Sequence, residues 1–290
     1  MNGIVIIDKP QDWTSQDVTA RLRRVFNTRR IGHGGTLDPM ATGVLPVFVG
    51  RATRGVEFFE HAEKTYEAVL RLGLTTDTED VTGNVLEQRE VDISEAEFLG
   101  ILPKFRGEIQ QIPPMYSALK VNGQKLCDLA RKGVEVERKP RNITIFALEC
   151  LAFTGMTARL RVRCSKGTYI RTLCKDIGEA LGCGGCMAAL RRVEAGEYTL
   201  EGAIPLRQLL DISEAGEDVE HFLRPVDTMF RNYPAVTLTP KQEIRCRNGN
   251  SFSVAMADGK YRAYGQNGEF LMLAQVEAGT MTTVKSFFEV

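Results

Sequence analysis

The chain has 290 residues, 43% of them hydrophobic and 26% charged, and its 37 basic residues balance its 37 acidic ones. This length suits one large domain, or one with a small appendage, and the composition is typical of a globular protein with a sizeable core. No stretch is apolar and long enough to cross a membrane, and the N-terminus lacks a signal-peptide pattern, which predicts a cytoplasmic protein without a membrane partner. Seven cysteines without paired spacing predict reduced thiols and no metal site, and we interpret Cys183 and Cys186 as part of a glycine-rich turn.

The zero net charge by itself argues against a nucleic-acid-binding protein, but the charges are unevenly distributed. Residues 116–192 contain fifteen Lys and Arg against six Asp and Glu, whereas residues 57–108 contain five against thirteen and residues 193–230 two against nine. A basic middle between acidic flanks is typical of a local face for an anionic ligand. Scattered, solvated charge is the alternative, because the sequence does not show that these side chains share one face.

The first predicted elements are a short apolar strand at 4–7 and a helix that begins at Thr14, with Asp17 as its capping-box partner. The helix carries a regularly spaced apolar stripe. Its members are Val18, Leu22, Val25 and Phe26.

A glycine-rich segment follows at 32–46 and carries one carboxylate, Asp38. Glycines let the backbone approach a ligand closely. Pro39 restricts Asp38 to extended geometry, so that its side chain points away from the chain in a defined direction. Asp38 is therefore a candidate catalytic group. The same Asp-Pro pair is also the pattern of a helix N-cap, and His33 is equally consistent with a turn residue.

Residues 53–61 predict a helix, and the alternating residues 64–73 predict a strand with Tyr66 at the head of its apolar face. Another helix is expected over 94–105, with Ser94 as its N-cap.

The stretch from about 113 to 141 combines a stiff Pro-Pro pair, an aromatic side chain and clustered cations. Such residues suit phosphate and base contacts in a single strand or loop of nucleic acid. The candidates are Tyr116, Lys120, Arg131, Lys132 and Arg141. A charged surface hairpin and helix would explain the same residues.

Residues 158–164 alternate between an apolar face and an arginine face, which predicts a strand. After a turn, a helix is expected that Thr168 caps and Gly182 ends. Tyr169 and Arg171 would then lie in its first turn, where the helix dipole favours an anion.

From about residue 233, short apolar runs are separated by turn signals. This alternation of short apolar runs and turn residues predicts a small β module, and three residue pairs within it are typical of hairpin turns. They are Asn248-Gly249, Asp258-Gly259 and Asn267-Gly268. We therefore expect a large domain over 1–230 and a small β domain over 231–290.

The glycine-rich segment resembles the catalytic-aspartate motif of the TruB family of RNA pseudouridine synthases, whose pattern is Gly-His-x-Gly-Thr-Leu-Asp-Pro-x-Ala-x-Gly-Val-Leu. Further blocks similar to that family follow the same order over about residues 3–195. They are Asp-Lys-Pro at 8–10, Lys-x-Tyr at 64–66, Tyr-Ser-Ala-x-Lys at 116–120, Lys-Gly-Thr-Tyr-Ile-Arg at 166–171 and Leu-Arg-Arg at 190–192. The chain departs from the family where it lacks a Gly among residues 11–13 and where Cys127 replaces an aromatic residue.

The resemblance implies an α+β fold, in which a catalytic domain with a mixed, largely antiparallel sheet flanked by helices precedes a β-barrel-like, PUA-type RNA-binding domain. It implies that Asp38 is the nucleophile, that Arg171 pairs with it and that Tyr169 lies beside both. Tyr66 would stack on the target base and would also serve in removing its C5 proton. The remaining implied substrate contacts are His33, Leu190 and Lys166, together with Tyr116, Lys120, Arg131, Lys132 and Arg141 of a mobile RNA-gripping loop at about 113–141.

The implied activity is the isomerisation of uridine to pseudouridine at position 55 in the T-loop of tRNA, on a base flipped out of its stack. The C1′–N1 bond breaks and a C1′–C5 bond forms without a change in formula, so we expect no cofactor and no metal. We also expect a monomer that binds the T-stem-loop without an obligate protein partner. The alternatives are a non-catalytic tRNA-folding factor and the catalytic subunit of a guide-RNA complex, which shares the motifs.

Overall fold

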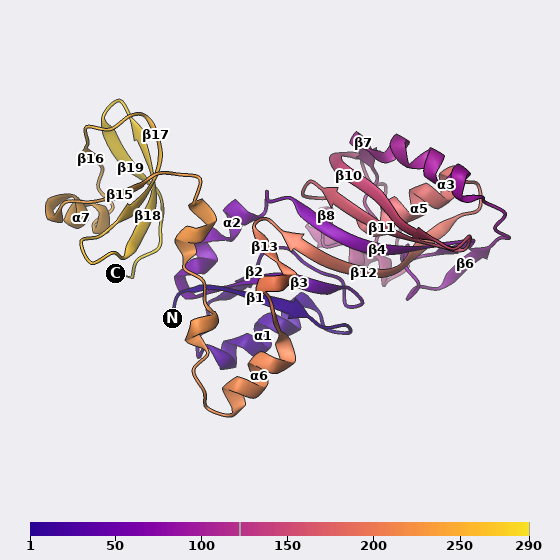
Figure 1. The fold of residues 1–290 in the computed structure, drawn as a ribbon, viewed down its shortest axis with the longest axis horizontal. Helices are drawn as coiled ribbons and strands as arrows, with labels where there is room; N and C mark the ends of the chain where they lie inside the picture. Colours follow the sequence, from indigo (N-terminus) through magenta and orange to yellow (C-terminus); the bar gives the residue numbers. More distant parts are fainter. Residues whose placement is uncertain (122, 290) are drawn as a thin grey trace. The chain divides into compact units, whose positions relative to one another are not determined.

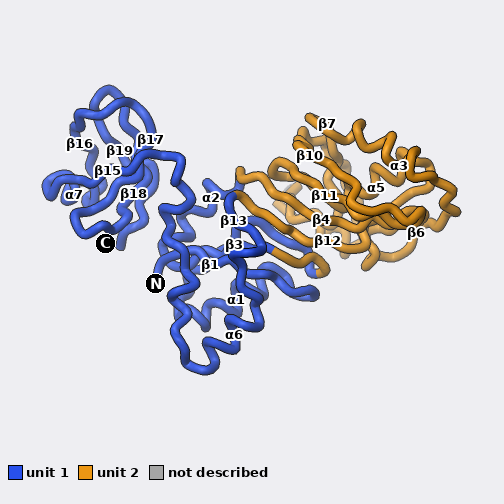
Figure 2. The backbone as a smooth tube through the Cα atoms, viewed as in Figure 1, with its two compact units in different colours: residues 1–39, 44–60, 197–290 blue, residues 40–43, 61–196 orange. Residues whose placement is uncertain are grey.

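The computed structural model describes residues 1–121 and 123–289 (Figure 1). The chain forms two compact units, shown in different colours in Figure 2. Unit 1 consists of residues 1–39, 44–60 and 197–290, and unit 2 consists of residues 40–43 and 61–196.

Unit 2 is built on an antiparallel sheet with the strand order β12-β4-β11-β10-β7. These strands are β4 (Lys64–Leu72), β7 (Gly107–Gln111), β10 (Arg141–Phe153), β11 (Thr157–Cys164) and β12 (Gly185–Ala195). On β4 the alternate residues Ala68, Leu70 and Leu72 are buried, and β11 alternates in the same way. The two expected strands are therefore confirmed, and the apolar side chains of both lie on one face of the sheet.

Helix α5 (Ile170–Ala180) packs against β12 and β4 and buries Leu173 and Ile177. It ends before Gly182, whose φ of +80° provides the left-handed residue that was expected. Its start differs from the expectation that Thr168 caps it. The Thr168 hydroxyl donates instead to the Ser165 carbonyl at 3.0 Å.

The N-cap of α5 is Tyr169, which is extended, with φ −102° and ψ 109°. Tyr169 therefore precedes the first turn in which it was expected, and only Arg171 lies within that turn. No side chain of the capping residue covers the first N–H groups of the helix.

The smaller elements of unit 2 surround this sheet. The expected helix over 94–105 is confirmed as an α-helix that tightens into a 3₁₀ turn, with Ser94 as its N-cap. The elements are β5 (Leu74–Thr76), β6 (Val85–Gln88), α3 (Glu95–Ile101), η2 (Leu102–Phe105), β8 (Lys120–Val121), β9 (Gln124–Lys125) and α4 (Leu126–Ala130).

The N-terminal part of unit 1 places β1 beside β14 and β3, and β2 antiparallel to β3. Thr14 caps α1 and forms the expected capping box with Asp17. The helix expected over 53–61 is shorter, because a 3₁₀ turn occupies 53–55 and the α-helix covers only 56–59. The elements are β1 (Gly3–Lys9), α1 (Ser15–Val25), β2 (Ile31–His33), β3 (Thr42–Val49), η1 (Gly50–Gly55), α2 (Val56–Phe59), β13 (Tyr198–Thr199), η3 (Leu200–Gly202), β14 (Ile204–Pro205), α6 (Leu206–Glu214), η4 (Glu220–Phe222) and η5 (Val226–Phe230).

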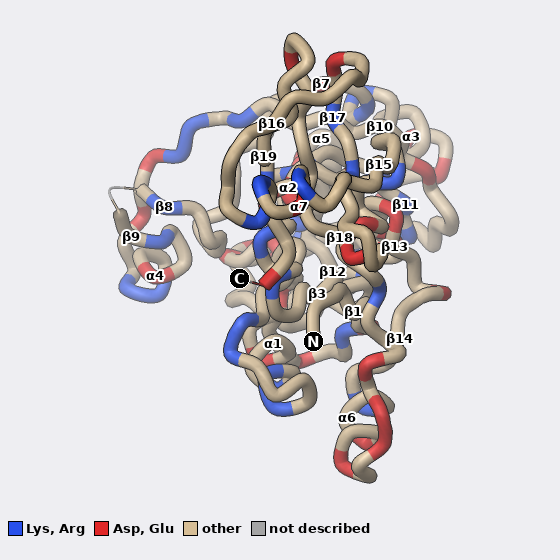
Figure 3. Tube along the Cα trace, turned by 90° about the vertical axis from the view of Figure 1, so that its left-hand side faces the viewer, with Lys and Arg blue, Asp and Glu red and all other residues tan. Residues whose placement is uncertain are grey.

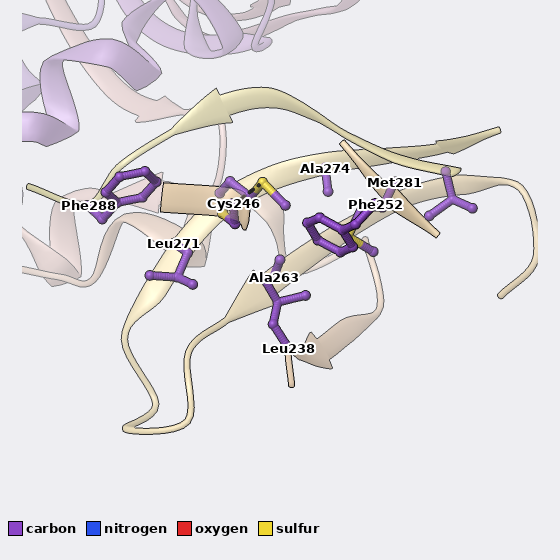
Figure 4. Close-up of a cluster of buried hydrophobic side chains, with 10 residues drawn as sticks. Leu238, Cys246, Phe252, Ala263, Leu271, Ala274, Met281 and Phe288 are labelled. Carbon is purple, nitrogen blue, oxygen red and sulfur yellow. Dashed lines mark hydrogen bonds between the residues drawn. The ribbon is translucent and has the colours of Figure 1, made fainter. Parts of the chain in front are cut away.

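The C-terminal part of unit 1 is a five-stranded sheet in the order β15-β17-β18-β19-β16. Its core contains Leu238, Phe252, Leu271 and other buried apolar side chains (Figure 4). The elements are β15 (Ala235–Thr237), α7 (Pro240–Arg247), β16 (Phe252–Ser253), β17 (Gly259–Tyr264), β18 (Phe270–Glu277) and β19 (Thr280–Ser286). The expected small β module is therefore present.

Two of the three expected hairpins in this module are wrong. Asn248 and Gly249 end helix α7, because the left-handed Gly249 (φ +73°) terminates a helix as readily as it turns a hairpin. Asp258-Gly259 leads from β16 to β17, which are not neighbours in the sheet. Only Asn267-Gly268 joins paired strands, β17 and β18.

The expected α+β class, with a mixed and largely antiparallel sheet, is confirmed. No helix within the described residues is long and apolar enough to span a membrane.

Candidate active site

The main chain on both sides of Asp38 is held in place by hydrogen bonds within unit 1. Before it, the buried Ser15 hydroxyl accepts from the Leu37 N–H at 2.8 Å and donates to the Leu37 carbonyl at 3.2 Å. After it, the Pro39 carbonyl accepts from the Lys9 ammonium at 3.2 Å and from the Asp12 N–H at 2.8 Å. The half-buried Asp38 therefore lies on a fixed piece of backbone.

No helix follows Asp38, because Pro39 and Met40 form a turn and β3 begins at Thr42. The alternative that Asp38 caps a helix is therefore wrong. Close packing also explains one glycine of the segment. A Cβ on Gly34 would lie 2.5 Å from the Phe59 ring, so only glycine fits there.

His33 is the last residue of β2 and lies opposite Val47 of β3. It is thus part of a strand pair, and its interpretation as a turn residue is wrong. The strand places His33 five residues before Asp38 in unit 1.

In unit 2, the Arg171 guanidinium is almost fully buried, with 5% exposure. It donates to the Thr78 carbonyl at 3.0 Å and to the Tyr116 carbonyl at 2.9 Å. Its Nε lies 3.9 Å from Asp80 Oδ2, and the other Asp80 oxygen accepts from Thr82 N–H and Thr78 Oγ1, each at 2.9 Å. A buried cation with these partners holds a fixed direction.

The first turn of α5, which carries Arg171, is attached to two neighbouring elements. The Gln111 side chain of β7 accepts from the Tyr169 N–H at 2.8 Å and donates to the Tyr169 carbonyl at 3.0 Å. Farther along, Thr172 Oγ1 donates to Glu79 Oε2 at 2.5 Å, and the same carboxylate pairs with Lys175 at 3.3 Å.

Tyr66 and Leu190 lie on adjacent strands of the unit 2 sheet, β4 and β12. Tyr66 is opposite Arg192 and Leu190 is opposite Ala68, so both belong to one face of the sheet. Tyr66 is half-buried and Leu190 is 8% exposed. The register thus places the aromatic ring and the apolar side chain that were expected to hold a base on the same side.

Among the fifteen cations of the basic middle, two groups of neighbouring residues differ in their ion pairs. Arg159, Arg161 and Arg163 lie on β11, and each has a carboxylate of Glu67 or Glu63 within 4.0 Å. Five others, all within residues 120–141, are exposed and form no salt bridge within the described residues. These are Lys120, Lys125, Lys132, Lys139 and Arg141.

The exposed cations follow β8, β9 and α4 and the chain leading to β10, where Figure 3 shows Lys and Arg in blue. Arg131 belongs to the same segment and lies 3.6 Å from Asp128, with most of its side chain exposed. Tyr116 is half-buried, and Lys166 lies in the turn before α5, with its Nζ 3.2 Å from His61 Nε2. We call residues 113–141 the basic segment.

The buried thiols are poor nucleophiles. Burial raises the pKa of Cys164 and of Cys186 to about 11, so both stay protonated at neutral pH. Cys183 precedes the left-handed Gly184 in the turn after α5, but Cys186 lies in strand β12, so the interpretation as a turn residue is wrong for Cys186. Among the described residues, no group of three His, Cys, Asp or Glu side chains could hold a metal ion.

Comparison with known families gives two adjacent matches. Residues 23–170 match the TruB family pseudouridylate synthase (N terminal domain), and residues 171–231 match the tRNA pseudouridylate synthase B C-terminal domain. The chain belongs to the TruB family. As a member of that family it is a pseudouridine synthase, which is an isomerase.

Relatives and solved structures agree with this assignment. Proteins named tRNA pseudouridine synthase B from Dechloromonas aromatica and Clostridium kluyveri are 48% and 40% identical to this chain. The alignments cover 92% and 99% of this chain and 89% and 100% of the relatives.

Two solved structures cover 99% of this chain and 85% of their own chains. The crystal structure of a Cbf5-Nop10-Gar1 complex is 26% identical with a TM-score of 0.74. An H/ACA RNP bound to a substrate RNA containing 2′-deoxyuridine is 24% identical with a TM-score of 0.73 and shows the same fold. The expected pseudouridine-synthase fold is therefore confirmed, and the curled C-terminal sheet fits a PUA-like domain.

This TruB-family chain contains supporting residues that the motif blocks did not single out. Asp80 pairs with the Arg171 side chain, Gln111 binds the Tyr169 main chain, and Ser15 binds the main chain of Leu37, the residue before Asp38. Gln111 and Tyr169 are 58 residues apart, so no local sequence pattern reveals their contact. Asp80 lies in an acidic turn in which the sequence alone distinguishes no single carboxylate.

Proposed function

We propose that this enzyme isomerises uridine to pseudouridine at position 55 in the T-loop of tRNA. The relatives named tRNA pseudouridine synthase B, which match over nearly their whole length, support tRNA as the substrate. They also favour a stand-alone enzyme over the catalytic subunit of a guide-RNA complex and over a non-catalytic tRNA-folding factor.

The observation that carries the proposal is the held backbone around Asp38. A carboxylate nucleophile reacts fastest when the protein holds it in one direction, because its orientational entropy is then lost on folding and not during the reaction. Ser15 and Lys9 fix the main chain of the residues before and after Asp38, and thereby the position of its Cα and Cβ. Asp38 acts as the nucleophile of the isomerisation, in which the C1′–N1 bond breaks and the C1′–C5 bond forms.

The remaining candidate residues take complementary roles in this proposal. Arg171 orients the Asp38 carboxylate, and the family resemblance assigns Tyr169 to the same catalytic group. Tyr66 stacks on the flipped uracil and serves in removing the C5 proton, and Leu190 covers the base. Flipping costs a few kcal/mol, which this stacking and apolar closure offset. The proposed substrate contacts are His33, Leu190 and Lys166, with Tyr116, Lys120, Arg131, Lys132 and Arg141 of the basic segment.

The domain roles complete the proposal. Residues 1–230 carry the chemistry, and residues 231–290 form a PUA-like RNA-binding domain. The enzyme acts as a cytoplasmic monomer on the T-stem-loop and requires neither a cofactor nor a metal.

Uridine labelled with tritium at C5 tests the proposal directly, because forming the C1′–C5 bond releases that hydrogen to water. Wild-type enzyme should release tritium from tRNA but not from a transcript with cytidine at position 55. Asp38→Asn keeps the shape of the side chain and removes its charge, so it should abolish release while RNA affinity changes little. Release by Asp38→Asn at near the wild-type rate would overturn the assignment.

A further inference from the structure

The side chain of Gln111 binds the main chain of Tyr169 through two hydrogen bonds. Its Oε1 accepts from the Tyr169 N–H at 2.8 Å and its Nε2 donates to the Tyr169 carbonyl at 3.0 Å. Gln111 ends β7 and is 3% exposed. Water therefore cannot readily replace either bond, and the loss of one leaves a buried polar group unsatisfied.

This contact holds the N-cap residue of a helix that has no side-chain cap. The first N–H groups of an α-helix have no acceptor within the helix, and the N-cap residue of α5, Tyr169, provides no side-chain cap. A primary amide offers both an acceptor and donors in one plane. Two parallel bonds to one residue therefore fix the direction in which the chain enters α5.

Arg171 follows two residues later, between two attachment points. Gln111 holds Tyr169 before it, and Glu79 holds Thr172 directly after it, at 2.5 Å. The Arg171 guanidinium itself donates to the Tyr116 carbonyl at 2.9 Å. The segment from Gln111 to Tyr116 is thus bound to the start of α5 at both of its ends.

We propose that Gln111 is a positioning residue for the isomerisation, because its amide fixes the main chain from which Arg171 projects. Gln111 touches neither the nucleophile nor the base in this role and acts through the α5 backbone. The inference rests on the proposed function of Arg171 in orienting the nucleophile.

The test compares variants that remove the two bonds in steps. Gln111→Met keeps the length of the side chain and makes neither bond. Gln111→Glu can accept from the Tyr169 N–H but, when ionised, cannot donate to the Tyr169 carbonyl. Gln110 is the matched control, because it lies on the same strand, is exposed, and as the neighbouring residue points to the other face.

Turnover is measured by tritium release at saturating tRNA, and RNA affinity is measured separately. A misplacement of about 1 Å costs up to about 100-fold in rate, so we expect Gln111→Met to lower kcat by about 10- to 100-fold. Gln111→Glu should give a smaller loss and Gln110→Met none. RNA affinity should stay within about threefold in all three, because phosphate contacts determine it.

A second measurement separates positioning from general destabilisation. Amide hydrogen exchange at Tyr169 and the first turn of α5 should accelerate in Gln111→Met, with the remainder of α5 unchanged. If Gln111→Met does not fold, kcat and amide exchange are compared between Gln111→Glu, which keeps one of the two bonds, and the wild-type enzyme.

A folded Gln111→Met enzyme with wild-type kcat would overturn the inference. So would a variant whose only defect is weaker RNA binding with kcat retained, because Gln111 would then serve the RNA contact. Failure of the proposed function looks different: wild-type enzyme itself would release no tritium, while exchange at Tyr169 would still respond to Gln111→Met.

Discussion

The Ser15 hydroxyl accepts from the Leu37 N–H and donates to the Leu37 carbonyl, at 2.8 and 3.2 Å. Ser15 is the first residue of α1, and both partners are buried. One small side chain therefore satisfies both polar groups of the residue before Asp38. The capping box formed by Thr14 and Asp17 fixes the start of α1 and therefore the position of Ser15. Through its bonds to Leu37, Ser15 in turn fixes the main chain that precedes the candidate nucleophile.

Ser15→Ala should lower kcat by about tenfold or more, because Leu37 loses both partners and the direction of Asp38 becomes less defined. RNA affinity should change little. Thr19→Val is the matched control, since Thr19 is also buried on α1 but its hydroxyl donates to the Gln16 carbonyl of the same helix. Tritium release at saturating tRNA checks the prediction, and equal kcat in the two variants would refute a role for Ser15.

RNA binding should weaken steeply as salt rises, because phosphate contacts release counterions. Lys132→Glu and Arg141→Glu should each remove one phosphate contact. Each substitution should therefore reduce the magnitude of the slope of log affinity against log salt concentration by about one. Both residues are exposed and form no salt bridge within the described residues. Lys104→Glu, at an exposed lysine outside the basic segment, should leave the slope unchanged. Filter binding of tRNA across a series of salt concentrations measures these slopes. If neither Lys132→Glu nor Arg141→Glu changes the slope, the basic segment does not contact the RNA phosphates.

The charge pattern shows what sequence reasoning could and could not predict here. The arginine face of β11 was predicted from strict alternation and is present, since a two-residue period needs no tertiary information. The pairing of Arg161 with Glu67 at 2.7 Å depends on the register of β4 against β11, which joins residues nearly a hundred positions apart. Part of the predicted basic face is therefore neutralised across strands, and the uncompensated cations are concentrated in residues 120–141.

Helix α7 was missed although its signals were present. Thr239, Pro240 and Gln242 form a capping box with Pro at the first position, as the Thr14 box does at α1 without the proline. The Asn248-Gly249 pair at its other end was interpreted as a hairpin, because both structures need a left-handed residue there. The motif blocks located the candidate site residues, but their supporting partners, such as Gln111, come from distant strands.

Asp176 of α5 should give the enzyme a pH-dependent stability. Burial raises its pKa from 3.8 to about 6, with Lys175 lowering it and Glu79 raising it. Because the folded-state value is the higher one, the contribution to stability is complete below about pH 4 and is lost as the pH rises through about 6. The ionised carboxylate therefore opposes folding at neutral pH.

Asp176→Asn should raise Tm by about 2–4 °C at neutral pH and should leave it nearly unchanged at about pH 4. Asp92→Asn serves as the control, because Asp92 is exposed and precedes α3. Thermal unfolding followed by circular dichroism at both pH values gives the comparison. A lower Tm for Asp176→Asn at neutral pH would mean that the carboxylate makes a favourable contact in its ionised form.

The C-terminal β module should contribute RNA affinity and not chemistry. Phe230 joins the module to α2, with ring centroids 5.4 Å from Phe58 and 5.8 Å from Phe287. Tyr264 donates to Asp227 at 2.6 Å, and Lys285 pairs with Glu57 at 2.5 Å. A cut after residue 231 therefore retains the Phe58–Phe230 contact and removes the five-stranded sheet as a whole.

The protein shortened to residues 1–231 should bind tRNA about tenfold or more weakly, since the phosphate contacts proposed for the module would be lost. Its kcat on a T-stem-loop at saturating concentration should stay within about tenfold of the full chain, because Asp38, Tyr66 and Arg171 all lie upstream of the cut. Circular dichroism confirms that the shortened protein is folded before tritium release is measured. A folded protein with no turnover at saturating RNA would show that the module takes part in the reaction itself.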